Sequence, residues 1–212
     1  MPRLMREEIA AVLLDIGAVG FSPEHPITFK SGIRAPVYVD NRRLPFHPAA
    51  WAQVIAGLAS LAEGLTFDAI AGIEAAGIPH SAALGYHMGQ PSLFVRKATK
   101  AHGTAQRIEG GKVSGRTILL VEDLVTTGGS SLSGVGALRE AGAEVHDCLA
   151  ITSYGFDEAA RAFAEANVHL HTLTDFPTIW RVARWRSDIT RPIIQAVEDW
   201  WRDPHHWTPP AN

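Results

Sequence analysis

The sequence predicts an α/β protein with a central, mostly parallel sheet that is flanked by helices. Between residues 48 and 173, short apolar runs typical of buried strands alternate with stretches in which apolar residues recur at helical spacing. Repeated βα units of this kind form parallel sheets that are covered on both faces. The chain has 212 residues, which is enough for one α/β domain and too few for two.

The predicted elements follow one another along this alternation. Residues 3–17 set charged side chains against apolar ones, which predicts an amphipathic helix rather than a signal peptide. Residues 27–41 are expected to form an extended hairpin with its turn near Lys30, and Pro36 favours a strand at a sheet edge. The remaining expected helices are 48–63, 78–87, 131–141 and 157–166, and the expected strands are 69–73, 92–96, 117–121, 145–153 and 168–173.

Composition and charge narrow the class of protein. The formal net charge is -3 and the isoelectric point is about 6.4, so the chain has no general electrostatic attraction to nucleic acid or to an anionic membrane. No apolar run in the sequence is long enough to span a membrane. The one cysteine, Cys148, falls in an expected strand and is predicted to be a small buried residue, which fits a reducing cytoplasm.

The most informative segment is Ile118–Ser131. Four apolar residues predict a buried strand, and two adjacent carboxylates, Glu122 and Asp123, follow it. A turn rich in glycine and hydroxyl groups comes next and leads into a helix. The N-terminus of a helix offers free backbone N–H groups to a phosphate, whereas the acidic pair suits sugar hydroxyls or a magnesium-bound polyol. Together these features indicate a site for a ribose 5-phosphate.

The same turn also has a plainer interpretation, in which a serine or threonine merely caps the helix. A nucleotide-binding P-loop is excluded, because the chain lacks the Gly-x-x-x-x-Gly-Lys-Ser/Thr pattern. The apolar strand and the acidic pair in front of the turn favour phosphate binding over simple capping.

Two further segments follow expected strands, at the edge of the sheet where ligands bind. Residues 74–79 form a small-residue turn that either holds a second anion, here a pyrophosphate, or is an ordinary βα connection. Residues 98–112 show neither helical nor strand periodicity, and a structureless loop of this length is typical of a functional lid. Its basic side chains and histidine would stabilise a departing pyrophosphate, and a solvated surface loop is the alternative.

Two motifs complete the pattern. Phe-Lys-Ser-Gly followed by Pro-x-Tyr-x-Asp occupies residues 29–40, and Arg-Lys followed by Lys-x-His-Gly occupies residues 96–103. Together with the ribose-phosphate segment, they resemble the orotate phosphoribosyltransferases of the type I phosphoribosyltransferase family, over about residues 1–185. Purine phosphoribosyltransferases share the ribose-phosphate motif but not these two motifs.

The resemblance implies the type I phosphoribosyltransferase-like fold, with a small hood and a long flexible catalytic loop. It implies a single domain, in which the hood takes up about residues 1–45, the core about 46–175, and the C-terminal helices and tail about 176–212. Orotate is expected to contact Tyr38, Val39 and Thr126, and the expected catalytic residues are Lys97, Lys100, His102 and Asp123. Phosphoribosyl pyrophosphate is expected to bind Lys30, Arg96, Lys97, Lys100, His102, Glu122, Asp123, Leu124, Val125, Thr126, Thr127, Gly128, Gly129 and Ser130.

The sequence departs from some family members at two positions. Some members carry a lysine where this chain has Ala76, and some carry an orotate-pairing arginine where it has Tyr154. How orotate is held without these two cations is left open by the sequence.

The C-terminal segment lies beyond the resemblance. Its aromatic and histidine residues are expected to pack a helix against the body, because the paired histidines lack further ligands at the spacing of a zinc site. These residues are Trp185, Trp200, Trp201, His205, His206 and Trp207. Residues 204–212 are rich in proline and are expected to fray.

The implied reaction is substitution at the anomeric carbon of phosphoribosyl pyrophosphate by N1 of orotate, giving orotidine 5'-phosphate and pyrophosphate in pyrimidine biosynthesis. The transition state is expected to have oxocarbenium character. Because anionic orotate already carries a nucleophilic nitrogen, the protein needs mainly to align the reactants and to neutralise the leaving group. Mg²⁺ is the implied cofactor, held mostly by substrate oxygens and water, with Asp123 or Glu122 as candidate protein ligands.

The resemblance further implies a cytoplasmic homodimer with shared active sites, in which Lys97 reaches into the partner's site and Arg96, Lys100 and His102 lie near the boundary. Two other functions stay open. One is a phosphoribosyltransferase for a purine or another base, and the other is a non-catalytic regulator that senses phosphoribosyl pyrophosphate and binds DNA. The regulator would need a basic helix-turn-helix extension, which the negative net charge and the short segment before the hairpin disfavour.

Overall fold

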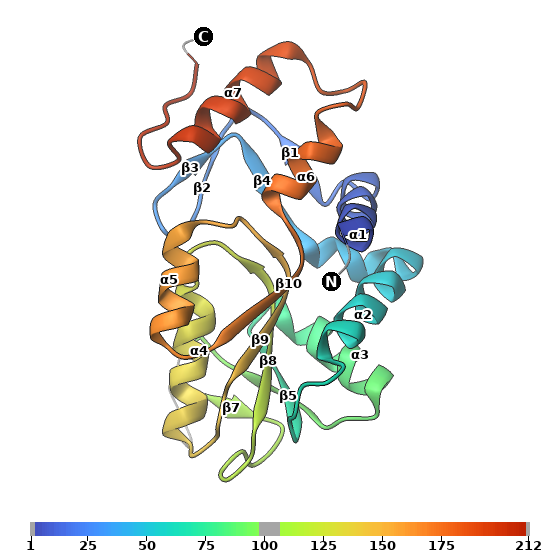
Figure 1. The fold of residues 1–212 in the computed structure, drawn as a ribbon, viewed down its shortest axis with the longest axis vertical. Helices are drawn as coiled ribbons and strands as arrows, with labels where there is room; N and C mark the ends of the chain where they lie inside the picture. Colours follow the sequence, from blue (N-terminus) through green and yellow to red (C-terminus); the bar gives the residue numbers. More distant parts are fainter. Residues whose placement is uncertain (1–2, 98–106, 211–212) are drawn as a thin grey trace.

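A six-stranded sheet forms the centre of the structure, a computed structural model that describes residues 3–97 and 107–210 (Figure 1). The strand order is β10-β9-β8-β5-β6-β7. The strands are β5 (Ala69–Ile73), β6 (Ser92–Val95), β7 (Ile108–Glu109), β8 (Ile118–Val125), β9 (Asp147–Ser153) and β10 (His169–Asp175). The pairing of β6 with β7 is antiparallel and the others are parallel, so the expected mostly parallel sheet is confirmed.

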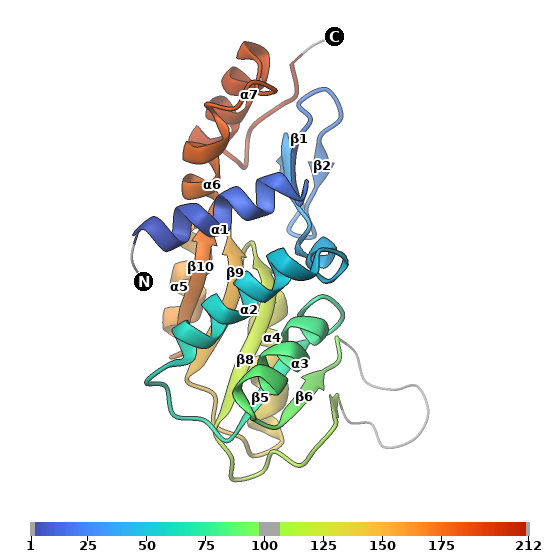
Figure 2. The same ribbon diagram turned by 90° about the vertical axis from the view of Figure 1, so that its right-hand side faces the viewer.

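Helices cover both faces of this sheet (Figures 1 and 2). On one face lie α1 (Arg3–Asp15), α2 (Pro48–Ala62) and α3 (Gly77–Met88), and on the other lie α4 (Gly129–Glu140) and α5 (Asp157–Glu165). Alternation along β8 explains the two layers, because Leu119 and Val121 pack into the first core and Ile118 and Leu120 into the second. Of the described helices, none is both long and apolar enough to cross a membrane.

The hood lies beyond one end of the sheet and is built from short antiparallel strands. The expected hairpin is present as β2 (Ile27–Thr28) and β3 (Arg34–Ala35). A second pairing, between β1 (Val19–Phe21) and β4 (Val37–Val39), was not predicted, because three-residue strands give no period-2 signal. A 3₁₀ helix, η1 (Asn41–Phe46), then leads to α2.

The C-terminal segment adds two helices, α6 (Phe176–Ala183) and α7 (Arg191–Arg202), which lie beside the hood (Figure 2). Trp200 of α7 is fully buried against Phe29 and Tyr154, so it joins the C-terminal helix to the hood. Trp201 and Trp207 are partly buried in the same core, as predicted. The expectation for Trp185 is wrong: its side chain is 81% exposed, because it follows α6 in the connection to α7.

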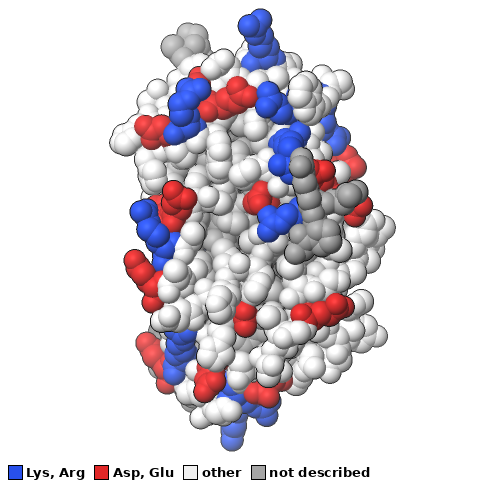
Figure 3. Space-filling model, in the orientation of Figure 1, with Lys and Arg blue, Asp and Glu red and all other residues white. Residues whose placement is uncertain are grey.

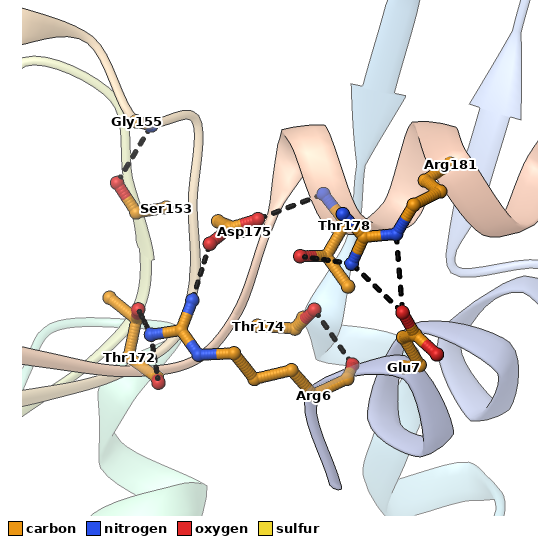
Figure 4. Close-up of polar contacts among 9 residues, drawn as sticks. All are labelled: Arg6, Glu7, Ser153, Gly155, Thr172, Thr174, Asp175, Thr178 and Arg181. Atoms are coloured by element: carbon orange, nitrogen blue, oxygen red, sulfur yellow. Dashed lines mark hydrogen bonds and ion pairs between the residues drawn. The ribbon is translucent and has the colours of Figure 1, made fainter. Parts of the chain in front are cut away.

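A cluster of polar contacts fastens α1 to β10 and α6 (Figure 4). The guanidinium of Arg6 pairs with Asp175 and also donates to the carbonyl oxygen of Thr172, at 3.3 Å. The other oxygen of Asp175 accepts the backbone N–H of Thr178 at 2.8 Å and thereby caps α6. Asp175 therefore ends the last strand, starts the next helix and holds the first helix in place.

Two sequence predictions are corrected by the sheet. β8 was expected to end at Val121, but it continues through Glu122 and Asp123 to Val125, because its ladder with β9 continues to Ser153. The segment 98–112 was expected to be without strands, yet Ile108 and Glu109 form β7 at the sheet edge. Residues 98–106 of that segment lie outside the described residues.

A buried histidine of α3, His80, faces α2. His80 is fully buried, and its Nδ1 accepts a hydrogen bond from Trp51 Nε1 at 3.0 Å. Its Nε2 has no hydrogen-bond partner among the described residues. Burial lowers the pKa of His80 to about 4, so the ring is neutral in the folded protein at pH 7.

We predict that His80 makes the fold acid-sensitive. The unfolded chain takes up a proton near the ordinary histidine pKa and the folded chain only near pH 4, so stability falls as the pH drops from about 6.5 to 4. The loss attributable to this group is at most about 3 kcal/mol. The free energy of unfolding, measured in urea across this pH range, should fall less steeply with decreasing pH in His80→Gln than in wild type. The exposed His87 on the same helix gives the control, His87→Gln; equal slopes in both variants would exclude His80 as the cause.

Candidate functional site

A cavity of about 530 Å³ opens where the hood meets the carboxyl ends of β5, β6 and β8. Ligands of open α/β sheets bind at this edge. The hood contributes Phe29, Lys30, Ser31, Val39, Asp40 and Arg42; the sheet edge contributes Glu74, Ala76, Lys97 and the continuous run from Glu122 to Ser131.

The turn between β8 and α4 forms an anion cradle. α4 begins at Gly129, so the turn presents free backbone N–H groups and the positive end of the helix dipole to the cavity. Gly128 has a φ of 86°, and a Cβ there would lie 3.0 Å from the ring of Phe163. Only glycine adopts this positive φ and leaves room for the Phe163 ring without strain. The hydroxyls of Thr126, Thr127 and Ser130 line the same cavity.

The acidic pair lies on β8, just before this cradle. Glu122 is only 5% exposed; its Oε1 accepts the backbone N–H of Asp123 at 3.1 Å, and its Oε2 lies 3.5 Å from the Ser131 hydroxyl. Burial, together with the neighbouring Asp123, raises the pKa of Glu122 well above its usual range. Burial also raises the pKa of Asp123, although several hydrogen bonds oppose that shift. Asp123 is therefore the member of the pair more readily ionised.

Asn41 connects the hood to the acidic pair, and the sequence analysis missed it. It is fully buried, and its Nδ2 donates to the backbone carbonyl of Asp123 at 2.7 Å and to the Thr152 hydroxyl at 3.4 Å. The amide thus fixes the start of η1 against β8. A buried asparagine in a short 3₁₀ helix has no sequence signature of its own, which explains why it was not predicted.

Lysines from two distant segments meet in the cavity. Lys30 comes from the hood hairpin and Lys97 follows β6, and the backbone N–H of Lys97 donates to Glu74 Oε2 at 3.0 Å. Partial burial and the adjacent Lys30 ammonium lower the pKa of Lys97. Two like charges held together in this way form a site for a multiply charged anion.

The turn after β5 lies opposite the cradle, and its first peptide bond, Glu74–Ala75, is cis. α3 begins directly behind it at Gly77, where a Cβ would lie 2.6 Å from the carbonyl oxygen of Val121. Glycine at this position therefore lets α3 pack directly on β8, which keeps the two turns on either side of one cavity.

Of the residues predicted to bind substrate, most line this cavity: Lys30, Val39, Lys97, Glu122, Asp123, Leu124, Val125, Thr126, Thr127, Gly128, Gly129 and Ser130. Tyr38 and Arg96 do not line it. The Tyr38 ring lies over Gly20 of the neighbouring strand, and the Arg96 guanidinium lies 3.5 Å from Glu109. Lys100 and His102 fall outside the described residues. Glu74 also lines the cavity and belongs to the turn 74–79 that the sequence offered as a second anion site, whereas Arg42 in the cavity and Asn41 beside it were not predicted.

The carboxylates of the site fit a divalent cation carried mainly by substrate. Among the described residues, no group of three or more histidine, cysteine or carboxylate side chains is placed to hold a metal ion. Glu122 is buried and already hydrogen-bonded, which leaves Asp123 as the best-placed protein ligand. A Mg²⁺ ion here would take most of its oxygen ligands from a bound pyrophosphate and from water.

Comparison with known proteins agrees with this geometry. A family model described as the phosphoribosyl transferase domain matches residues 47–168, more than half of the chain. The orotate phosphoribosyltransferase of Bacillus caldolyticus is 38% identical over 205 residues, which cover 96% of this chain and 99% of that protein.

Two solved structures are also similar. The orotate phosphoribosyltransferase of Aeropyrum pernix has a TM-score of 0.75 at 28% identity and covers 84% of this chain and 99% of its own. That of Mycobacterium tuberculosis H37Rv, in complex with 5-phospho-alpha-D-ribosyl 1-diphosphate, has a TM-score of 0.65 at 25% identity, covering 82% and 98%.

The fold and the cradle with its acidic pair define a phosphoribosyltransferase, and the family match covers both. Identity over nearly the whole chain is more specific: the protein belongs to the orotate phosphoribosyltransferase family. The resemblance seen in the sequence is thereby confirmed, and it extends beyond residue 185 into the C-terminal helices.

We predict that the cradle depends on the left-handed backbone at Gly128. Gly128→Ala should lower the free energy of unfolding by about 1–2 kcal/mol, because an L-residue is strained in that conformation and its Cβ would press on Phe163. Gly129→Ala is the matched control, since its Cβ would meet no atom within 4 Å. Urea unfolding of the ligand-free protein should leave Gly129→Ala as stable as wild type or slightly more so. Equal losses in both variants would contradict this assignment.

Proposed function

We propose that this chain is an orotate phosphoribosyltransferase in pyrimidine biosynthesis. It transfers the ribose 5-phosphate group of phosphoribosyl pyrophosphate to N1 of orotate and releases pyrophosphate. The observation that carries this proposal is a single cavity, in a member of this family, in which an anion cradle, a carboxylate pair and a pair of lysines face one another.

The cradle and the acidic pair bind the ribose 5-phosphate end of the substrate. The 5-phosphate takes the backbone N–H groups and hydroxyls of Thr126–Ser130. Asp123, one step earlier on β8, accepts hydrogen bonds from the ribose hydroxyls. Because both groups lie on one rigid strand and turn, the anomeric carbon is held in a fixed place relative to the phosphate.

The two lysines bind the pyrophosphate end. Negative charge grows on the leaving group as the glycosidic bond breaks, and Lys30 and Lys97 lie in position to stabilise it. Lys100 and His102, which lie outside the described residues, are proposed to share this role. Bound Mg²⁺ would neutralise further charge on the pyrophosphate.

The orotate ring lies at the hood. Val39 of the hood offers an apolar surface and Thr126 of the cradle turn a hydroxyl, and both residues line the cavity. Orotate needs no strong general base, so the hood has to align N1 with the anomeric carbon and to exclude other bases. The exposed Tyr38 on the outer side of β4 would reach orotate only by a rearrangement of the hood.

The charge distribution does not favour a DNA-binding regulator. On the face shown in Figure 3, lysine and arginine side chains are spread among acidic ones and do not gather into one basic surface. The formal net charge of -3 points the same way, because nucleic-acid binding depends on clustered cations.

We predict Mg²⁺-dependent consumption of orotate and of neither purine. A spectrophotometric assay with phosphoribosyl pyrophosphate and Mg²⁺ should offer orotate, hypoxanthine, adenine and uracil separately, with a metal-free reaction as the control. Orotate should be consumed and the two purines should not, because the hood motif, not the cradle, distinguishes the base. Turnover of hypoxanthine or adenine that is faster than turnover of orotate would overturn the assignment.

We also propose a homodimer, located in the cytoplasm, with shared active sites; the division into hood, core and C-terminal helices stays a prediction. Phe46 and Tyr86 support a second copy, because these large side chains are 86% and 93% exposed on a single chain. Lys97 lines the cavity of its own chain in the single chain that the structure describes. Its expected reach into the partner's site, with Arg96, Lys100 and His102 near the boundary, stays a prediction.

We predict that inactive variants complement one another across the dimer. Mixed after subunit exchange, Lys97→Ala and Asp123→Ala should regain about a quarter of wild-type activity, since half of random dimers are mixed and each then has one intact site. Lys30→Ala with Asp123→Ala is the matched control and should regain none, because both residues are proposed to serve the site of their own chain. Absence of recovery in the first mixture, with exchange demonstrated by mass spectrometry, would show that each lid closes over its own site.

A further inference from the structure

The charges of the cavity leave one cation without a role in the proposed reaction. Three described cationic side chains line the cavity: Lys30, Arg42 and Lys97. Lys30 and Lys97 lie close enough for each ammonium to affect the other, so they form a single positive centre. Arg42 comes from η1, and not from the hairpin or from the segment after β6 that carry the two lysines.

The contacts of Arg42 hold one edge of its guanidinium and leave the other edge exposed. Its Nε pairs with Asp40 Oδ1 at 2.5 Å, which holds the side chain by one edge. The side chain is nevertheless 70% exposed, and among the described residues no hydrogen bond is formed by its two terminal nitrogens. A guanidinium held in this way offers its two terminal NH₂ groups as a fork, the geometry that matches a carboxylate.

Arg42 also lines the same cavity as the ribose-binding carboxylate, Asp123. The charges of Arg42 and Asp123 affect each other's pKa, raising that of Arg42 and lowering that of Asp123. In orotate the carboxylate is on C6, directly next to N1, the atom that attacks the ribose. A group that binds this carboxylate must therefore lie next to the group that holds the ribose, and Arg42 meets that condition.

Lys97 also lines the cavity and interacts with Asp123, but it forms one positive centre with Lys30, which the proposed reaction assigns to the pyrophosphate. Ala76 and Tyr154 stand where some family members have cations, and the Tyr154 side chain is fully buried among Phe29, Phe156 and Trp200. The Arg96 guanidinium faces Glu109 and not the cavity.

We propose that Arg42, oriented by Asp40, binds the carboxylate of orotate and is the residue that selects orotate over uncharged pyrimidines. This inference rests on the proposed function and adds to it the group that recognises the base. It explains how the site holds an anionic pyrimidine with alanine at position 76 and tyrosine at position 154.

The test compares Arg42→Gln with wild type on orotate and on uracil, which lacks the carboxylate. Arg42→Gln should lower kcat/KM for orotate by roughly 10- to 100-fold, the scale of one lost hydrogen-bonded charge pair. The rate with uracil and the Kd for phosphoribosyl pyrophosphate, measured by calorimetry, should stay within about twofold of wild type, a range that is small against that loss. Arg43→Gln is the matched control, because the neighbouring Arg43 donates to the carbonyl of Gly17 at 2.7 Å and does not line the cavity.

The outcomes separate this inference from the proposed function. If wild type fails to use orotate, the proposed function itself is wrong. If wild type uses orotate and Arg42→Gln keeps the preference for it over uracil, Arg42 does not bind the carboxylate. If the variant instead loses affinity for phosphoribosyl pyrophosphate with an unchanged KM for orotate, Arg42 acts on the ribose through Asp123, and the inference is overturned.

Discussion

The site depends on unequal pairing along the two edges of β8. Its ladder with β5 ends at Val121, whereas its ladder with β9 continues to Val125. From Glu122 onward β8 therefore has a neighbouring strand on one edge only, and residues of this part of β8 line the cavity. The acidic pair gains the rigidity of a central strand without being covered by a neighbour on the ligand side. The cradle follows at once, so its position is set by the same ladder.

Placing two carboxylates side by side on β8 disfavours their ionisation, and nearby cations offset this effect. Two adjacent carboxylates at a nearly buried position resist ionisation, and the pKa values of both are raised. Lys97 favours the ionised form of Glu122, and Arg42 favours that of Asp123. The cations that serve the substrates in the proposed reaction thus also stabilise the empty site.

Much of this fold follows from sequence pattern, because apolar runs and helical spacing report burial directly. β5 has the predicted boundaries, and α2, α3 and α4 differ from theirs by one or two residues. The cradle and the acidic pair were also predictable, since their residue types are dictated by the chemistry of phosphate and sugar. What escaped prediction depends on tertiary contacts. The continuation of β8 depends on β9, Asn41 acts through a carbonyl distant in sequence, and Arg42 is an ordinary surface arginine until the hood places it at the cavity.

The aromatic stack of Phe29, Tyr154 and Trp200 gives the last helix an influence on chemistry that it does not touch. Phe29 immediately precedes Lys30, so the lysine's backbone rests on a ring that α7 supports from behind. Shortening the chain before Trp200 would remove the far side of that support. The resulting protein would keep its sheet and its cradle, yet its hairpin would be free to swing away from the pyrophosphate. The last helix of this chain therefore supports the hairpin that carries Lys30, and a boundary drawn at the end of the sheet would remove that support.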